Sequence, residues 1–128
     1  MKLKKQKQLF IWLAIVIVVV GFVTFFTVKN NQPGQLDDFA SCIAQSGAKF
    51  YGAFWCPHCR NQKELFGNSA RLLPYVECST PDGNSQNITC TDKKIDSYPT
   101  WEFADGTRET GELTLDFLAE KTSCELIK

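Results

Sequence analysis

The chain has 128 residues, with 14 basic and 14 acidic side chains, six cysteines and one histidine. This length leaves room for one small domain. The formal neutrality hides an asymmetry, because residues 29–128 carry ten basic and fourteen acidic side chains, a net charge of −4. No basic patch of the kind that binds nucleic acid is present in this part, so we expect no nucleic-acid partner.

The N-terminal part is apolar and not globular. Residues 1–8 contain four lysines and no acid, and residues 9–28 follow with twenty uncharged side chains. A helix of that length spans a hydrocarbon core of roughly 30 Å, and the lysines favour a cytoplasmic N-terminus. A cleaved signal peptide is the alternative, but the apolar run is long and no A-x-A-like site follows it. We therefore predict a basic cytoplasmic tail and a single-pass anchor in the cell membrane, with the C-terminal part extracytoplasmic.

The rest of the chain predicts a linker and one α/β domain, residues 29–35 and 36–128. Apolar spacing and turn residues predict the elements in chain order. They are a helix at 36–45, a strand at about 49–55, a helix at 57–66 that continues after a kink to 73, a strand at 74–78, a polar loop at 79–89, a short helix at 90–96, strands at 101–103 and 107–110, and a helix at 113–121. This order favours a mixed central sheet of about four strands with helices on both faces.

Two cysteines enclose Pro57 and His58 where the predicted central strand gives way to a helix. Helical spacing puts Cys56 and Cys59 on one face, within reach of a disulfide, and proline suits the first helical turn. The N–H groups and dipole of the helix end favour negative charge, so the Cys56 thiolate should be stabilised. His58 can add positive charge or a hydrogen bond to the same sulfur. We predict a redox pair in which Cys56 attacks and a shielded Cys59 resolves.

The same spacing also occurs in zinc sites and in structural disulfides. A four-ligand zinc site would need a second close pair or a suitably spaced histidine, and His58 is the only histidine. We therefore expect no metal and no cofactor. The remaining cysteines are far apart in the sequence: Cys42, Cys78, Cys90 and Cys124. An even number of cysteines in an exported domain permits three bridges, whose pairing the spacing alone does not fix.

The run from Trp55 to Cys59, followed some forty residues later by Tyr98 and Pro99, resembles the signature of thioredoxin-fold proteins. The resemblance covers about residues 36–124 and implies a thioredoxin-like fold. It also implies that Pro99 is cis and lies beside the active-site disulfide, where its missing N–H leaves no donor near the sulfurs. Tyr98 would then offer backbone groups to a bound substrate strand. Trp55, Tyr98 and Pro99 are the predicted substrate-binding residues, in a shallow apolar groove.

A narrower resemblance is to the thioredoxin-like domain associated with bacterial vitamin K epoxide reductase homologues. The residues that carry it lie at 50–59, 62–67, 74–78 and 98–101. It implies a redox partner of a quinone-linked membrane enzyme, passing oxidising equivalents to the thiols of exported proteins. In that family the domain is usually fused to the membrane bundle, whereas this chain has one anchor helix. A separately encoded partner enzyme is therefore implied.

Two further expectations follow from the resemblance. Many thioredoxins carry a buried acid six residues before the first cysteine, where this chain has Phe50, which mildly favours an oxidant over a reductant. The resembled family often has cysteines at the positions of Cys78 and Cys90, which implies a structural bridge there, with free thiols or a relay pair as alternatives. Cys42 and Cys124 would then pair by elimination and tie the first helix of the domain to the last.

The sequence thus predicts a membrane-anchored extracytoplasmic protein thiol–disulfide oxidoreductase. An extracytoplasmic thiol reductase and a non-catalytic tethered binding module are the alternatives. The direction of electron flow stays open at this point.

Overall fold

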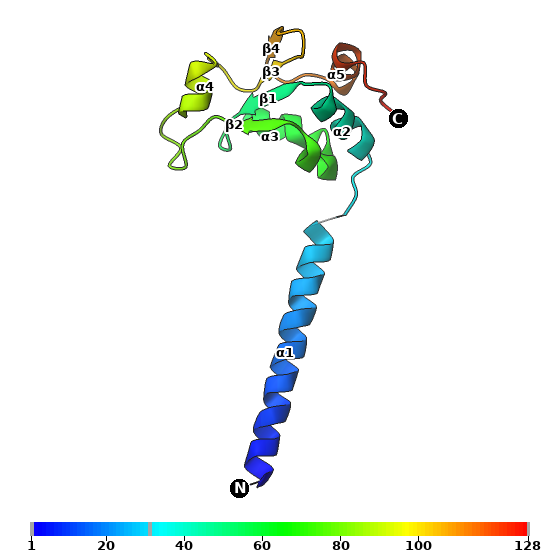
Figure 1. Ribbon diagram of the computed structural model, residues 1–128, viewed down its shortest axis with the longest axis vertical. Helices are drawn as coiled ribbons and strands as arrows, with labels where there is room; N and C mark the ends of the chain where they lie inside the picture. Colours follow the sequence, from blue (N-terminus) through cyan, green and yellow to red (C-terminus); the bar gives the residue numbers. More distant parts are fainter. Residues whose placement is uncertain (1, 31, 128) are drawn as a thin grey trace. The chain divides into compact units, whose positions relative to one another are not determined.

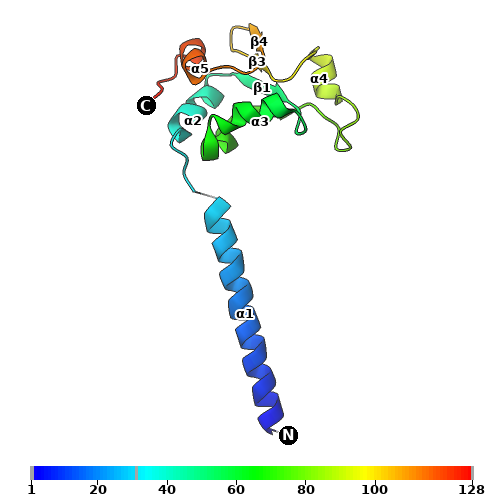
Figure 2. The ribbon, with the colours of Figure 1, turned by 180° about the vertical axis from the view of Figure 1, so that it is seen from behind.

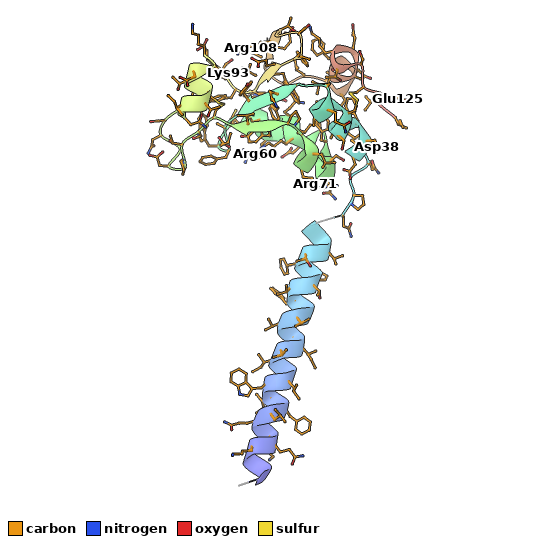
Figure 3. All side chains as sticks on the ribbon, in the orientation of Figure 1. Asp38, Arg60, Arg71, Lys93, Arg108 and Glu125 are labelled. Atoms are coloured by element: carbon orange, nitrogen blue, oxygen red, sulfur yellow. A yellow bond between two sulfur atoms is a disulfide. The ribbon has the colours of Figure 1, made fainter. Side chains whose placement is uncertain are left out.

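The computed structural model describes residues 2–30 and 32–127, which fall into two compact units, Met1–Gln32 and Pro33–Lys128. The first unit holds the long helix α1 (Lys2–Asn30), which extends beyond the predicted anchor at both ends (Figure 1). Its stretch Lys5–Val28 is long and apolar enough to cross a membrane. Figure 3 shows side chains on both edges of this helix, and its large apolar side chains are exposed in the structure. A helix that is apolar all round suits a lipid environment.

The second unit is built on a four-stranded mixed sheet, as predicted, with the order β2–β1–β3–β4. Strand β1 (Lys49–Gly52) runs parallel to β2 (Tyr75–Glu77) and antiparallel to β3 (Thr100–Glu102). Strand β4 (Arg108–Thr110) pairs antiparallel with β3. Since two parallel neighbours need a crossover connection, the segment between β1 and β2 has to be helical or long.

Helices provide this crossover and flank the sheet. The crossover consists of α3 (Pro57–Glu64) and the 3₁₀ helix η1 (Gly67–Leu72), where the sequence predicted one kinked helix. Helix α2 (Asp37–Gln45) precedes the sheet, α4 (Ile88–Asp92) lies between β2 and β3, and α5 (Leu115–Thr122) follows β4. Figures 1 and 2 both show α4 at the end of the unit away from α2 and α5.

Both faces of the sheet are covered. Alternate strand residues point to opposite sides, and a buried cluster lies on each side. Phe50 and Trp101 are register partners whose rings stack with centroids 4.6 Å apart. They belong to the larger core, to which α2, α3 and α5 contribute. Tyr51 points to the other face, into a smaller buried cluster with Cys78 and Cys90. The expectation of helices on both faces is met by α4, which carries Cys90.

Strand β1 is shorter than predicted, and this changes the setting of two aromatic residues. The strand ends at Gly52, and the backbone N–H of Cys56 donates to the carbonyl of Ala53 at 3.0 Å, which closes a turn. Phe54 and Trp55 therefore lie in a turn with exposed side chains and not in a buried strand. The prediction was wrong here because large aromatic residues favour strands when nothing else is known.

Helix α4 also differs from its prediction, which placed a helix at 90–96 after a loop. The side chain of Asn87 caps the helix, since its Oδ1 accepts from the Cys90 N–H at 3.1 Å. Its Nδ2 donates to the carbonyl of Glu77 at 2.6 Å. Asparagine is a favoured N-cap residue, so the helix starts at Ile88, inside the segment predicted as loop. The bounds of α2, α3, α5 and the other strands lie within two residues of those predicted.

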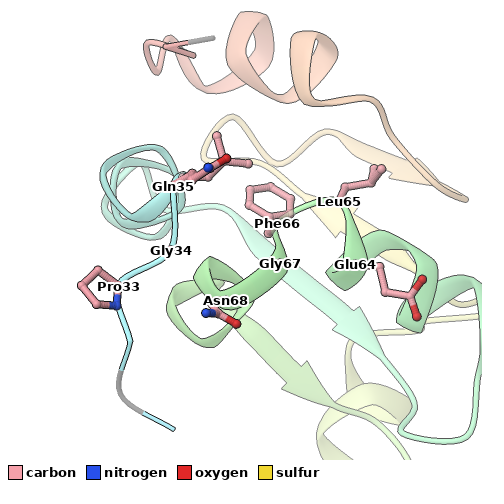
Figure 4. A pocket seen from close by; sticks show the side chains of 9 residues that line it. Pro33, Gly34, Gln35, Glu64, Leu65, Phe66, Gly67 and Asn68 are labelled. Atoms are coloured by element: carbon pink, nitrogen blue, oxygen red, sulfur yellow. The ribbon is translucent and has the colours of Figure 1, made fainter. Parts of the chain in front are cut away.

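The segment before α2 belongs to the second unit, although residues 33–35 were predicted as linker. Gly34 lies so close to Ser69 that an added Cβ would sit 2.1 Å from the Ser69 Oγ. The backbone N–H of Leu36 donates to the same Oγ at 3.0 Å. Arg71, labelled in Figure 3, forms an ion pair with Asp37 at 2.6 Å. Between this segment and the end of α3 lies a cavity of about 320 Å³ (Figure 4), which contains none of the cysteines.

Two disulfides connect distant parts of this unit. Cys42 in α2 bonds to Cys124 just after α5, across 82 residues of sequence. Cys78 at the end of β2 bonds to Cys90 in α4, across 12 residues. Both pairings are those expected from the sequence, and they leave Cys56 and Cys59 as free thiols.

Removal of either disulfide should destabilise the second unit by an amount that grows with the closed loop. The chain-entropy model gives a loss of about 4.5 kcal/mol for Cys42→Ala with Cys124→Ala, against about 3 kcal/mol for Cys78→Ala with Cys90→Ala. Urea unfolding of the full chain in detergent, followed by tryptophan fluorescence, measures both losses. Equal losses, or a larger loss for the shorter loop, would contradict this expectation.

Candidate active site

The two free cysteines lie where β1 gives way to α3. Cys56 has an extended backbone, with φ −74° and ψ 121°, and forms the N-cap of the helix, while Pro57 is its first residue. Proline costs nothing at that position because the N–H that it lacks has no partner within the helix. Cys59 lies one turn further along the helix, on the side that is buried. The local arrangement is the one predicted from the sequence.

Pro99 and its neighbour complete this site from the other end of the fold. The Cys56 sulfur lies 3.7 Å from the carbonyl oxygen of Tyr98, to which its S–H donates. The Tyr98–Pro99 peptide bond is cis. Because Thr100 begins β3, which pairs with β1, the sheet itself brings these residues to Cys56.

Both thiols are enclosed, and Cys56 more so than an attacking thiol requires. Cys56 is 5% exposed and Cys59 is 2% exposed. Cys56 belongs to the buried core cluster, and Tyr98 packs against that cluster. The order of exposure agrees with the predicted roles, but the difference is small. Only a small part of the Cys56 surface is therefore open to a partner sulfur.

Cys59 is packed against the end of β1. An added Cβ on Gly52 would lie 2.8 Å from the Cys59 sulfur and 2.8 Å from Cε2 of Tyr75, so a side chain there has no room. Burial raises the pKa of the Cys59 thiol, and the backbone of Ala53 and the charge of Lys63 partly offset this rise. A thiol that is costly to ionise and out of contact with solvent matches the shielded role predicted for it.

The His58 side chain makes its hydrogen bond to a group other than the Cys56 sulfur. Its Nδ1 is 2.7 Å from Oε1 of Glu112, and Asn61 Nδ2 donates to the same oxygen at 3.0 Å. The hydrogen bond expected between His58 and the Cys56 sulfur is therefore replaced by one to Glu112. His58 and Asn61 are three residues apart on the outer face of α3, so one carboxylate reaches both. No local sequence signal links Glu112 to this helix, since it follows β4 more than fifty residues later.

Trp55 and Tyr98 lie together beside Cys56. Their rings meet edge to face with centroids 6.1 Å apart, and Trp55 Nε1 donates to Ser79 Oγ at 3.0 Å. The two rings and the loop at 79–86 line a cavity of about 230 Å³. The predicted substrate-binding residues Trp55, Tyr98 and Pro99 are thus brought together. The hollow beside them is more polar than the apolar groove expected, because the loop contributes serine, asparagine and glutamine side chains.

Three side chains whose contacts the sequence does not predict, Lys63, Tyr75 and Glu77, lie on the Cys59 side of the site. The Nζ of Lys63 is 3.3 Å from the centroid of the Tyr75 ring. The Tyr75 hydroxyl donates to Oε2 of Glu77 at 2.8 Å. The sequence marks Glu77 as a nearby acid but assigns it no role. The position where many thioredoxins carry a buried acid is occupied by Phe50, which is fully buried in the core.

The disulfides bear on the zinc interpretation of the Cys-x-x-Cys pair. The other four cysteines are bonded to one another, so their thiolates are not available as ligands. These bonds favour a reactive dithiol over half of a metal site.

Comparison with known proteins supports the same chemistry. No family model matches the chain. The chain is similar to the thiol-disulfide oxidoreductase LTO1 of Arabidopsis thaliana, with 47% identity over an alignment of 85 residues that covers 62% of this chain. It spans only 22% of the length of that protein. The likeness therefore concerns one part of a longer oxidoreductase.

A side chain at Gly52 should disturb Cys59. We expect Gly52→Ala to lower the free energy of unfolding by about 1–3 kcal/mol, because the added methyl group has to displace the Cys59 sulfur or the Tyr75 ring. The same variant should form the Cys56–Cys59 disulfide more slowly. Urea unfolding and the rate of thiol loss after addition of oxidised glutathione measure the two effects. Gly21→Ala is the control, since no heavy atom lies within 4 Å of its added Cβ, and a Gly52→Ala protein that matches it in both assays would contradict the packing described.

The Glu112 carboxyl should titrate at unusually low pH. The hydrogen bond from His58, and then that from Asn61, lower the pKa of Glu112 below its usual value of 4.5. Since the pKa in the folded state is the lower one, this interaction stabilises the fold above pH of about 4.5, and the stabilisation disappears as the pH falls through the folded-state pKa. A ¹³C NMR titration of the side-chain carboxyl measures it. His58→Ala should return the midpoint toward 4.5, and an unchanged midpoint in this variant would refute the assignment.

Proposed function

We propose that this chain is a membrane-anchored, extracytoplasmic thiol–disulfide oxidoreductase with a thioredoxin-like fold. The observation that carries the proposal is the placement of two free thiols at the start of α3, with Cys56 3.7 Å from the carbonyl that precedes Pro99. The similarity to a named thiol-disulfide oxidoreductase supports the same chemistry for the part of the chain that is aligned.

The proposed thioredoxin-like fold is supported by topology as well as by the motif. The reactive pair follows the central strand β1, α3 crosses to the parallel strand β2, and β3 and β4 form an antiparallel hairpin before α5. Pro99 precedes β3, the neighbour of β1, so the proline and the cysteines lie at adjacent strands. This is the arrangement that the resemblance of the sequence implies.

The proposed reaction is thiol–disulfide exchange. A substrate thiolate attacks the Cys56 sulfur of the Cys56–Cys59 disulfide, which forms a mixed disulfide and releases Cys59 as a thiolate. A second substrate thiolate then attacks the substrate sulfur of this mixed disulfide and releases Cys56. The substrate gains a disulfide, and the protein gains two electrons and, after protonation, two thiol hydrogens. Run backwards, the same steps reduce a substrate.

The proposed location rests on α1 and on the cysteines. Lysines before the apolar stretch favour retention of the N-terminus in the cytoplasm, which leaves the second unit outside. The disulfides Cys42–Cys124 and Cys78–Cys90 suit an oxidising compartment. The substrates that we propose are therefore thiols of exported proteins.

The proposed electron acceptor is a quinone-linked membrane enzyme like vitamin K epoxide reductase. The residues at 50–59 and 98–101 support this through their resemblance to the domain associated with such enzymes. An oxidant is favoured over a reductant because Phe50 occupies the place of the acid that assists proton transfer in many thioredoxins. The anchor would keep the dithiol in the same membrane as its acceptor.

Trapping of partners tests the function. In cells that produce Cys59→Ala, mixed disulfides on Cys56 should accumulate, since the thiol that resolves them is missing. Non-reducing electrophoresis followed by mass spectrometry identifies the trapped proteins. Cys56→Ala is the matched control and should trap none. The absence of reductant-sensitive complexes with Cys59→Ala would contradict the proposed exchange, and trapped proteins confined to the cytoplasm would contradict the proposed location.

A further inference from the structure

Cys59 has a basic neighbour on its own helix. Lys63 follows it by four residues, a spacing that places both side chains on one face of α3. The Lys63 ammonium lies 3.3 Å from the centroid of the Tyr75 ring. A Cβ added to Gly52 would lie 2.8 Å from Cε2 of the same ring and 2.8 Å from the Cys59 sulfur, so the ring and the sulfur are neighbours. The Tyr75 ring therefore has the Lys63 ammonium on its face and the Cys59 sulfur close to its edge.

The Lys63 ammonium is held against the Tyr75 ring, and a carboxylate fixes that ring. The face of an aromatic ring attracts a cation, and the Tyr75 hydroxyl is fixed by its hydrogen bond to Glu77 at 2.8 Å. The other carboxylate oxygen of Glu77 accepts from the backbone N–H groups of Phe54 at 3.2 Å and Ser79 at 2.9 Å. Glu77 thus connects β2 to the turn that leads into Cys56. Through Tyr75 it also fixes the ring on which the Lys63 ammonium lies.

The charge of the Lys63 ammonium favours a charged sulfur at Cys59, against burial and the neighbouring Cys56, which raise the pKa of the Cys59 thiol. In the described part of the chain, the ionisable groups that face Cys59 are Cys56, Lys63 and Tyr75, with Glu77 behind the tyrosine. Burial raises the pKa of Tyr75, so its hydroxyl stays a neutral donor to Glu77. Burial lowers the pKa of Lys63, while the charges of Cys59 and Glu77 act in the opposite direction. Lys63 is therefore the cation available to a Cys59 thiolate.

We propose that the Lys63 ammonium stabilises the Cys59 thiolate each time the Cys56–Cys59 disulfide opens or closes, and that Tyr75 and Glu77 are positioning residues for this ammonium. The proposal rests on the exchange reaction proposed above. In many thioredoxins a buried acid at the position of Phe50 assists the reaction by proton transfer. In this chain the charge of Lys63 would assist it instead. The residue acts through the sulfur of Cys59 and touches no substrate.

The same thiolate occurs in both directions of exchange. When a substrate thiolate attacks Cys56, the bond between the two protein sulfurs breaks and its electron pair stays on Cys59, which later takes a proton from water. When a mixed disulfide on Cys56 closes, the Cys59 thiolate attacks the Cys56 sulfur, and the substrate leaves with the electron pair of the broken bond. A cation beside Cys59 speeds both steps. When Cys59 leaves, the cation stabilises the leaving thiolate. When Cys59 attacks, the cation increases the fraction of Cys59 that is thiolate by more than it reduces the nucleophilicity of that thiolate.

A two-step reaction with 5,5′-dithiobis(2-nitrobenzoate) separates the roles of the two cysteines. In the reduced full chain in detergent, attack by Cys56 releases one coloured thiolate, and closure by Cys59 releases a second at a rate independent of reagent concentration. The closure rate rises with pH as Cys59 ionises, and we expect this rise to lie about one pH unit higher in Lys63→Met. The fraction of Cys59 that is thiolate at pH 7 then falls about tenfold. Each remaining thiolate is about threefold more nucleophilic, because its pKa is higher. Closure should thus slow by about threefold, with the first release unchanged.

Two variants distinguish charge from packing. Lys63→Arg keeps the cation and should restore the closure rate and its pH profile to those of the unchanged protein. Lys121→Met is the matched control, because Lys121 also lies over an aromatic ring, 5.4 Å from the Phe103 centroid, but outside the site. Its closure rate should stay unchanged. Tyr75→Phe keeps the ring and loses the bond to Glu77, so it should slow closure by less than Lys63→Met does.

The outcomes separate this inference from the proposed function. A normal first release with an unchanged closure rate and pH profile in Lys63→Met overturns the role of Lys63 and leaves the exchange reaction standing. Equal slowing in Lys63→Met and Lys63→Arg also overturns it, because packing and not charge would then be responsible. If Cys56 releases no first thiolate in the unchanged protein, the proposed function fails and this inference fails with it.

Discussion

The packing of the Cys59 sulfur against the backbone of Gly52 is the contact on which the site depends. It requires that β1 end in a residue without a side chain, so that the first turn of α3 can lie directly on the sheet. The turn that follows then delivers Cys56 to the helix N-terminus. Since β3 pairs with β1, the Tyr98 carbonyl comes to the Cys56 sulfur from the neighbouring strand. One close approach thus fixes the positions of both thiols.

The two thiols have different surroundings, and this difference is the basis of the chemistry proposed. Cys56 is the N-cap of α3 and contacts the Tyr98 carbonyl, whereas Cys59 lies one turn further along the helix and packs against the end of β1. Burial makes a charged Cys59 costly, and the charge of Lys63 offsets part of that cost. The structural disulfides stabilise the surrounding helices, so that a small unit can tolerate the cost of charged groups near its core.

Much of this arrangement could be predicted from local sequence patterns. Apolar spacing, glycines and prolines indicated the order of strands and helices, and the motif placed Cys56 and Cys59 at a strand–helix junction. The errors have physical causes. Phe54 and Trp55 have the composition of a strand but lie in a turn, and the cap that starts α4 depends on a side-chain hydrogen bond of Asn87. The His58–Glu112 contact joins residues 54 apart, and no local pattern reports such pairs.

The central claim is that Cys56 and Cys59 form one reversible redox pair beside two permanent disulfides. Equilibration of the full chain with glutathione buffers of graded potential, followed by acid quenching, alkylation and mass spectrometry, tests it directly. We predict that only Cys56 and Cys59 change between dithiol and disulfide, and that they do so together, with a midpoint nearer about −120 mV than about −270 mV. Independent oxidation of the two thiols, or exchange of Cys42–Cys124 or Cys78–Cys90 in their place, would contradict it.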